Sequence, residues 1–215
     1  MGKHLWAPRR LSDHLVLLRG ADDRPARQRI ARDLLADMLG FEVAVEHDPY
    51  GKPRLAGSEV CISFSHRDGW LLIGTAAHDI GVDLELIQPG LDVARTHFSP
   101  AEAHWLARTD QTDAFTRLWT AKEAVLKAVG TGIAQGLDQP DFSAFLIEGQ
   151  PFDLPACDVV HAGAAFRVSW HTIGENEPAA VACSAIRHAA DTFSCLILSA
   201  PAPLPLAAHA GDGVS

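Results

Sequence analysis

Three strand-like runs of apolar residues, at 60–66, 70–76 and 80–86, follow one another closely and restrict the fold more than any other feature of the chain. Only the segments 67–69 and 77–79 separate these runs, and connectors this short are typical of hairpins. We therefore predict an up-down-up meander of three antiparallel strands.

Helices are predicted before and after these strands. Residues 24–39 and 113–129 carry apolar side chains at helical spacing, and a glycine directly follows each segment, as is common after a helix C-terminus. A shorter helix is predicted to begin at Ser99. Ser99 and Glu102 are spaced for a capping box, and Pro100 suits the first helical position.

Strand-like segments also fill the second half of the chain, so each half offers a helix and a small set of strands. We predict an α/β (α+β) fold of two pseudo-symmetric lobes, 1–90 and 91–200, each a helix packed on a small antiparallel sheet. Residues 201–215 are rich in Pro, Ala and Gly, which predicts a disordered tail. The strands expected in the second half are 141–147, 166–173, 179–186 and 193–199.

Composition narrows the class of function. The 215 residues carry a formal net charge of −9, which argues against a protein that binds nucleic acid through its phosphates. There is no signal peptide and no apolar run long enough to span a membrane, so we expect a cytoplasmic protein with no membrane partner. The four cysteines lack the C-x-x-C spacing of zinc sites, and buried free thiols are expected for the three in strand-like segments, Cys61, Cys183 and Cys195.

Two carboxylates interrupt the apolar run at 80–86. Asp83 and Glu85 lie two residues apart, so they share one face of the predicted strand while apolar side chains take the other. Two interpretations remain open. The face is either a solvated polar surface or a site for a hard cation such as Mg²⁺, which takes carboxylate oxygens and often completes its shell with substrate phosphates.

The predicted helix 113–129 carries a second group of charges. Trp119, Glu123 and Lys127 lie in one row at i, i+4 spacing. Glu123 and Lys127 form either an ordinary helix salt pair or part of a metal–phosphate site. Lys122 falls inside the core stripe of the same helix, where it needs an anion because burying an unpaired charge is costly.

Two further segments offer groups that suit a phosphate site, although each is also an ordinary turn. Ser65 and His66 end the first of the three strands, at the sheet edge where the carboxylate pair is expected. Lys52 and Arg54 lie on either side of Pro53 and offer two more cations.

Together these segments resemble one protein family. PYGKPRL, ISFSHRDGWLLIGTA, IGVDLELI, FSPAEAHWL and LWTAKEAVLKAVGTGI occur in the order and spacing of the 4′-phosphopantetheinyl transferases, of the larger, two-lobed type that includes the surfactin-synthesis enzyme. The resemblance implies coenzyme A bound in a cleft between two lobes, which forms the active site. It also implies Mg²⁺-dependent transfer of the 4′-phosphopantetheine arm to a serine hydroxyl of an apo acyl or peptidyl carrier protein, which releases adenosine 3′,5′-bisphosphate.

The resemblance implies roles for the charged residues. Asp83, Glu85 and Glu123 match the magnesium ligands of the family. Glu123 is also expected to be the base that acts, directly or through a water, on the carrier serine. Lys127 matches the lysine that meets the phosphate under attack, so Asp83, Glu123 and Lys127 are expected in both catalysis and cofactor binding.

The remaining matches concern the nucleotide of coenzyme A. Lys52 and Pro53 match a segment that lines the nucleotide site, and Ser65 and His66 match a pair that binds the 3′-phosphate end. The family usually has a longer N-terminal segment with a basic residue for this phosphate. Candidate replacements here are Arg24, Arg27, Arg29 and Arg32, of which we assign Arg27 and Arg32 to cofactor binding.

Two other functions remain open. A magnesium-dependent phosphodiesterase or phosphatase would use the same carboxylates, and a non-catalytic protein would keep the fold to bind coenzyme A or a carrier protein. No metal ligand of the family pattern is missing, which favours the transferase. The sequence leaves open whether the carrier protein serves fatty-acid, polyketide or nonribosomal peptide synthesis. The family implies a monomer.

Overall fold

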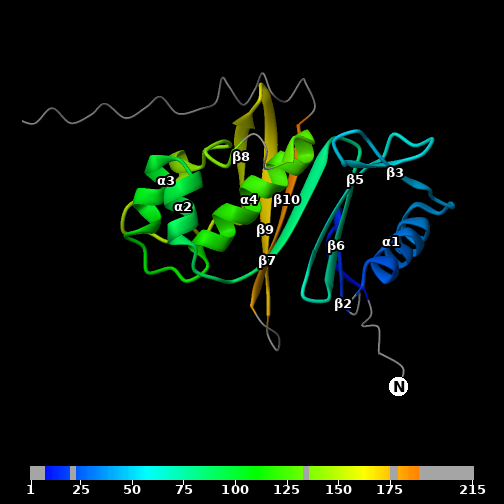
Figure 1. Ribbon diagram of the computed structural model, residues 1–215, viewed down its shortest axis with the longest axis horizontal. Helices are drawn as coiled ribbons and strands as arrows, with labels where there is room; N and C mark the ends of the chain where they lie inside the picture. The colour runs from blue at the N-terminus through cyan, green and yellow to red at the C-terminus, as the bar shows by residue number, and fades with distance from the viewer. Residues whose placement is uncertain (1–7, 20–22, 133–135, 175–178, 189–215) are drawn as a thin grey trace, which may run out of the picture.

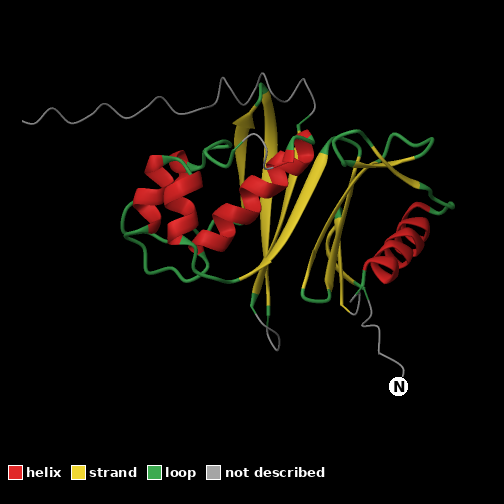
Figure 2. Cartoon of the chain, in the orientation of Figure 1, coloured by secondary structure: helices red, strands yellow, loops and turns green. Residues whose placement is uncertain are grey.

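Two antiparallel sheets face each other in the structure, with helices on their outer sides (Figure 1, Figure 2). The computed structural model describes residues 8–19, 23–132, 136–174 and 179–188. The elements in chain order are β1 Arg9–Ser12, β2 Leu15–Arg19, α1 Arg24–Leu39, β3 Val45–His47, β4 Pro53–Leu55, β5 Cys61–Arg67, β6 Trp70–Ala76, β7 Ile80–Leu86, α2 Leu91–His97, α3 Pro100–Leu106, α4 Ala114–Val129, the 3-10 helix η2 Ser143–Phe145, β8 Ala156–His161, β9 Ala164–Ile173 and β10 Ala180–Arg187.

The layers stack in the order helix, sheet, sheet, helices (Figure 1). Helix α1 packs on the six-stranded sheet β1-β2-β6-β5-β4-β3 through residues such as Leu35 and Ile73. Helix α4 packs on the four-stranded sheet β7-β10-β9-β8, and α2 and α3 lie farther out. Apolar side chains such as Leu72 and Leu84 fill the space between the two sheets. This α+β arrangement confirms the predicted fold class.

Local signals set the ends of the N-terminal elements as predicted. Asp23 caps α1, because its Oδ1 accepts a hydrogen bond of 2.7 Å from the amide of Ala26, and Gly40 ends the helix with a φ of 79°. The β5–β6 hairpin turns on Asp68 and Gly69, whose φ angles of 45° and 79° are the positive values that a two-residue hairpin turn requires.

Strand β7 departs from the predicted meander. It pairs with β10 along its whole length and not with β6. The prediction that residues 80–86 form the third strand of an up-down-up meander was therefore wrong. The physical reason is that β2 and β5 already occupy both edges of β6. Strand β7 instead packs across β5, where the amide of Leu84 donates to Ser65 Oγ at 3.2 Å and that of Val82 donates to Ser63 Oγ at 3.1 Å. The acidic strand therefore joins the two sheets.

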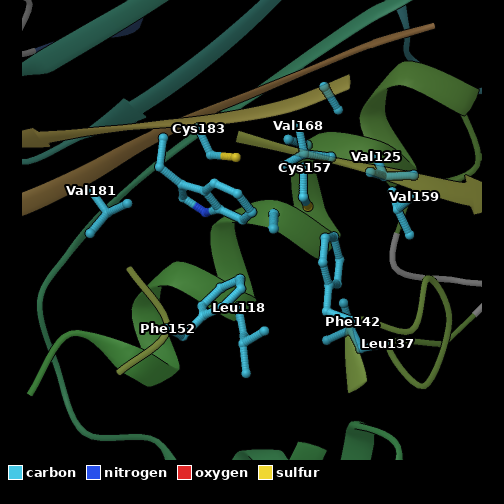
Figure 3. Packing of buried hydrophobic residues seen from close by; sticks show 14 of the residues in the cluster. Leu118, Val125, Leu137, Phe142, Phe152, Cys157, Val159, Val168, Val181 and Cys183 are labelled. Atoms are coloured by element: carbon cyan, nitrogen blue, oxygen red, sulfur yellow. The ribbon is translucent and has the colours of Figure 1, made fainter. Parts of the chain in front are cut away.

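The C-terminal core lies between α4 and its sheet (Figure 3). Leu118 and Val125 of α4 are fully buried there and belong to one cluster with Val168 and Cys183 of the strands. The helix ends at Gly130, whose φ is 89°. This core fixes the height and rotation of α4 above β7, and thereby the position of its charged residues.

Two sequence expectations for the C-terminal half have different outcomes. The strand predicted at 141–147 was wrong, because residues 143–145 form the 3-10 helix η2. The side chain of Asp141 favours this turn by accepting a hydrogen bond of 2.9 Å from the amide of Ser143. Strand β8 was missed, and the predicted strand at 193–199 lies outside the described residues.

The remaining expectations are settled only in part. Cys61 and Cys183 are free thiols as predicted, and Cys157 is free as well, whereas Cys195 and the tail 201–215 lie outside the described residues. Within the described part of the chain, no helix is long and apolar enough to cross a membrane. The lobe boundary after residue 90 stays a prediction.

Candidate active site

One cluster joins the acidic strand to helix α4. Lys127 Nζ on α4 lies 2.6 Å from Asp83 Oδ1 on β7, and the same oxygen accepts a hydrogen bond of 3.0 Å from Ser65 Oγ on β5. Lys127 Nζ also donates to the carbonyl of Val82 at 3.2 Å. The structure thus brings together three of the predicted site residues from three different elements.

The close approach of α4 to β7 depends on Gly81. Gly81 and Asp83 are two apart and share the face of β7 that meets α4. A Cβ atom at Gly81 would overlap the carbonyl oxygen of Ala124 on the helix. The glycine of the IGVDLE segment is therefore a packing requirement, because only its missing side chain lets α4 bring Lys127 down to Asp83.

Glu123 lies one turn before Lys127 and is buried, with 7% of its surface exposed. Burial, and after it the nearby charge of Asp83, raises the pKa of the Glu123 carboxyl to about 7, although Lys127 acts in the opposite direction. Among the described residues, Glu123 Oε1 is buried without a hydrogen-bond partner. The carboxyl therefore titrates near neutral pH, and a cation that reaches it would favour its ionised form.

Glu85 shares the face of Asp83 but has other partners. Its Oε1 lies 2.9 Å from Arg67 Nε and accepts a hydrogen bond from the amide of Leu86. Partial burial raises the pKa of the Glu85 carboxyl. The described ranges contain no group of three or more His, Cys, Asp or Glu side chains arranged to hold a metal ion. Of the three predicted metal ligands, Glu123 and Glu85 both feel the charge of Asp83, but Glu85 is also paired with Arg67.

Asp83 and Glu123 nevertheless fit a magnesium ion as a pair. Mg²⁺ prefers oxygen ligands and is commonly held by one or two carboxylates together with substrate phosphates. Glu123 Oε1 is such an oxygen without a hydrogen-bond partner, and the negative charge of Asp83 acts on the same carboxyl. The ammonium group of Lys127 in the same cluster would attract the phosphates.

A cavity of about 270 Å³ opens beside this cluster, between the turn at 50–53, strand β5 and the end of α4. Lys127 lines the cavity as well as contacting Asp83, and thus connects the two. Lys52 and Pro53, both predicted for the nucleotide site, also line it. The Lys52 ammonium does not extend into open space, because it lies 2.6 Å from Asp79 Oδ1.

The predicted 3′-phosphate pair is divided in the structure. Ser65 belongs to the Asp83 cluster, whereas His66 is exposed at the end of β5. Partial desolvation, and then the positive charges of Arg27 and Lys127, lower the pKa of His66. These groups thus form one electropositive region. Arg32 is exposed and lies 3.7 Å from the carboxylate of Asp33, so the geometry favours Arg27 over Arg32.

Lys122 has a structural partner. Its Nζ lies 2.8 Å from Glu102 Oε2, both side chains are 0% exposed, and it also donates to the carbonyl of Pro140 at 2.6 Å. Glu102 accepts further hydrogen bonds from the amides of Ser99, which closes the predicted capping box, and Phe142. The anion that buried Lys122 requires is therefore the capping-box glutamate. The sequence contained both halves of this pair but no signal that they meet.

A larger cavity of about 630 Å³ lies elsewhere, between α3 and residues 143–151, and contains none of the predicted site residues. Several of its polar groups bond to one another or to the backbone. Arg108 and Glu148 lie 2.5 Å apart, and the Gln111 amide bonds the backbone of Phe152 in both directions. We therefore place the candidate active site at the smaller cavity, beside Asp83, Glu123 and Lys127.

Comparisons with known proteins point to the same part of the chain. A family model described as the 4′-phosphopantetheinyl transferase superfamily matches residues 79–184. The match begins directly before β7 and ends within β10, so it contains both the acidic strand and α4.

Curated relatives carry the same description. The chain is 38% identical over 120 residues to a putative 4′-phosphopantetheinyl transferase of Synechocystis sp., a match covering 51% of this chain and 48% of the relative. It is 33% identical over 121 residues to a 4′-phosphopantetheinyl transferase of Bacillus subtilis, covering 54% and 53%. It is 34% identical over 117 residues to the 4′-phosphopantetheinyl transferase Sfp of Bacillus subtilis strain 168, covering 52% and 51%. The chain thus spans about half the length of the curated relatives it matches.

Proposed function

Since the chain belongs to the 4′-phosphopantetheinyl transferase superfamily, we propose that it transfers the 4′-phosphopantetheine arm of coenzyme A to a serine hydroxyl of an apo carrier protein. The other product is adenosine 3′,5′-bisphosphate. The partners are coenzyme A and an acyl or peptidyl carrier protein, and nucleic acid and membranes are not among them. A cytoplasmic location and a monomeric state belong to the same proposal.

The observation that carries this proposal is the convergence of Asp83, Glu123 and Lys127 beside one cavity. The first comes from β7 and the other two from α4, about 40 residues later in the chain, so the cluster is a product of the fold and not of local sequence. An ordinary helix salt pair between Glu123 and Lys127 does not account for it, because Lys127 is bonded to Asp83.

Glu123 suits the role of general base. A base acts best when its pKa lies near the working pH, and the pKa of Glu123 is about 7. It takes the proton of the carrier serine, directly or through a water. The serine oxygen then bonds to the β-phosphorus of coenzyme A, and the bond from that phosphorus to the bridging oxygen of the pyrophosphate breaks. The electron pair leaves with adenosine 3′,5′-bisphosphate.

Charge neutralisation is the other requirement of this reaction. Phosphoryl transfer proceeds mainly through positioning and electrostatic stabilisation of the phosphate oxygens. Lys127 supplies a positive charge at the mouth of the cavity, where it leaves Asp83 for the phosphate under attack. Asp83 and Glu123 would hold Mg²⁺, which when bound polarises the phosphates. Glu85 joins this set only if it releases Arg67.

The nucleotide end of coenzyme A is assigned to the cavity lined by Lys52 and Pro53. The 3′-phosphate is assigned to the region of His66 and Arg27, because the positive charges that act on His66 would attract a phosphate. Arg32 and Ser65 are less suited to bind this phosphate. Arg32 is exposed beside Asp33, and Ser65 is bonded to Asp83.

Mass spectrometry of apo carrier proteins incubated with the protein, coenzyme A and Mg²⁺ tests the proposal. A transferase adds the mass of one phosphopantetheine arm to a single serine, whereas a phosphodiesterase only degrades the nucleotide and a binding protein leaves both substrates unchanged. Acyl carrier proteins and peptidyl carrier domains assayed side by side identify the partner class.

Variants test the assigned roles in the same assay. Replacing Glu123 by Gln is expected to lower transfer by about 10²–10⁴-fold, the usual contribution of a positioned acid–base group. Replacing Asp83 by Asn weakens a proposed magnesium ligand and is expected to lower transfer strongly as well. Glu148→Gln is the matched control, because it removes an exposed carboxylate from the other cavity. Near-normal transfer by Glu123→Gln would contradict its role as the base.

A further inference from the structure

Lys52 is the most enclosed lysine at the candidate site, and its ammonium group has two partners. The side chain is 8% exposed, and Nζ lies 2.6 Å from Asp79 Oδ1 and 2.5 Å from the carbonyl oxygen of Ala128. Asp79 lies directly before β7, and Ala128 lies in the last turn of α4. One ammonium group therefore links the turn that carries Lys52 to the start of β7 and to the end of α4.

The turn itself is rigid. Asp48 Oδ1 accepts hydrogen bonds from the amides of Tyr50 and Lys52, each of 2.9 Å, and Gly51 has a φ of 87°. A turn held in this way has little freedom of its own. Its position relative to α4 therefore depends on contacts made by the Lys52 side chain.

The end of α4 needs such a partner. The last four carbonyl groups of a helix lack intrahelical donors and carry partial negative charge, so a cation stabilises them. Lys52 supplies that cation to Ala128, one residue after Lys127. The stem of Lys52 also packs against Gly130, where an added Cβ would lie 3.1 Å from Lys52 Cδ.

Asp79 is held in place from the opposite side. Its Oδ2 lies 3.3 Å from Arg187 Nη1, and its carbonyl accepts a hydrogen bond of 2.8 Å from the amide of Arg187 at the end of β10. Burial acts against ionisation of Asp79, but the hydrogen bonds and charges of Lys52 and, after it, Arg187 together outweigh burial and lower the pKa of the carboxyl. Asp79 is thus a charged, anchored partner for Lys52.

We propose that Asp79 is a positioning residue for coenzyme A binding, which acts by holding Lys52 as a strut between the two walls of the cavity. One wall is the turn at 50–53 and the other is the Lys127 end of α4. Lys52 then shapes the nucleotide site through its stem and its bonds to protein, rather than through contact of its charge with a phosphate. This inference rests on the proposed function for the identity of the ligand.

Hydrogen exchange of the protein without ligand tests the strut directly. Asp79→Asn is expected to speed amide exchange about tenfold or more in both cavity walls, at residues 50–53 and 128–132, because a charge-assisted hydrogen bond is replaced by a weaker one. Arg187→Gln is the matched control, because it removes the other cation beside Asp79 and leaves Lys52 in place. Unchanged exchange in both walls of Asp79→Asn would overturn the proposal.

Coenzyme A titrations with Lys52→Met, Asp79→Asn and the double variant separate a strut from a direct ligand contact. If Lys52 is a strut, each single change weakens binding by about tenfold, and the second change adds little in the background of the first. At saturating coenzyme A, the kcat of Asp79→Asn stays within about threefold, because the Asp83 cluster is intact. Lys52→Arg keeps a cation at the junction and is expected to restore most of the affinity.

The opposite pattern overturns the inference. If Lys52→Met weakens coenzyme A binding while Asp79→Asn does not, Lys52 contacts the ligand directly. Hydrogen exchange needs neither ligand nor carrier protein, so failure of the proposed function and failure of the strut are distinguishable. A protein that transfers nothing but shows coupled exchange in the two walls disproves only the former.

Discussion

Two neighbouring residues of α4 show opposite solutions to the same problem. Lys122 and Glu123 are both buried charged groups, 0% and 7% exposed. Lys122 bonds Glu102 and the carbonyl of Pro140, and the Glu102 oxygens are satisfied in turn. Glu123 keeps an oxygen without a partner, and its pKa is raised to about 7. A complete network stabilises a fold, whereas an incomplete one leaves a group ready to bind or to react.

The sequence separates Lys122, in the core stripe of the helix, from Glu123, in the row with Lys127, but it does not show which partners either residue has. What separates them is the direction of each side chain. Lys122 faces α3 and the loop at Pro140, and Glu123 faces the acidic strand. Variants at each network should therefore change different properties, namely stability at the first and pH dependence and activity at the second.

The largest effect is expected from breaking the complete network. Lys122→Met leaves the Glu102 carboxylate buried without its ion-pair partner, which is expected to lower the free energy of unfolding by about 3–5 kcal/mol. Urea denaturation at pH 7 measures this loss. Lys3→Met, at a position outside the described residues, removes the same charge and serves as the control. A decrease in the free energy of unfolding below about 1 kcal/mol for Lys122→Met would show that the buried pair is not what stabilises this region.

The incomplete network predicts the opposite sign for Glu123→Gln. The pKa of Glu123 is about 7 in the folded protein against 4.5 for a free carboxyl, so the folded state binds more protons between these values and loses stability as pH rises through that window. Glu123→Gln removes this loss. It is expected to stabilise the protein on the order of 3 kcal/mol at pH 8 and to have little effect on stability below pH 4.

Denaturation series across pH, with a chelator present, measure the difference between wild type and Glu123→Gln. A difference that does not change with pH would assign the effect to packing instead of ionisation. The same variant should lose transfer activity, so the residue that lowers stability is the residue that the proposed reaction requires.

Gly81→Ala tests the comparison of the two networks in another way, because it should move the whole of α4, which carries both Lys122 and Glu123. Its new methyl group overlaps the Ala124 carbonyl, so the helix must shift away from β7, at a cost of about 1–3 kcal/mol for overpacking. The shift should separate Lys127 from Asp83 and reduce transfer by more than the stability loss alone explains. Full activity at a temperature where the variant is folded would contradict the packing argument.

The smallest effect is expected at Glu85, the third predicted magnesium ligand. Arg67→Gln releases Glu85 from its ion pair and lets it turn toward Asp83. Because Arg67 is exposed and such pairs contribute at most about 1 kcal/mol, Mg²⁺ affinity should rise by no more than about fivefold. Calorimetric titration with Mg²⁺ measures the change. An unchanged affinity would exclude Glu85 from the metal site and leave Asp83 and Glu123 as its protein ligands.

The parts of the fold that were predictable have short-range signals. The capping box at Ser99, the glycines after α1 and α4, and the Asp68–Gly69 turn each act within a few residues, and all appear as expected. The prediction of a strand at 141–147 was wrong because the apolar content of this segment is typical of a strand. The Asp141 side chain instead bonds the local backbone and favours a turn.

The parts that were not predictable depend on contacts between distant segments. Pairing of β7 with β10 follows from which sheet edges remain free, and no local pattern encodes it. The same holds for the Arg67–Glu85 pair and for the bond from Lys52 to Asp79. Resemblance to a family identified residues of the candidate site, but their mutual distances required the folded chain.

The pairing of β7 with β10 also determines when, during translation, the candidate site can form. Residues 80–86 leave the ribosome about 100 residues before the strand that fixes them in a sheet, so long-range pairing must wait for the C-terminal segment. A nascent chain that ends before residue 180 contains all of the acidic and lysine side chains of the candidate site but lacks the strand that seats β7. Catalytic competence should therefore appear late and abruptly, once β10 has been made, and products of this chain that end before β10 should be inert.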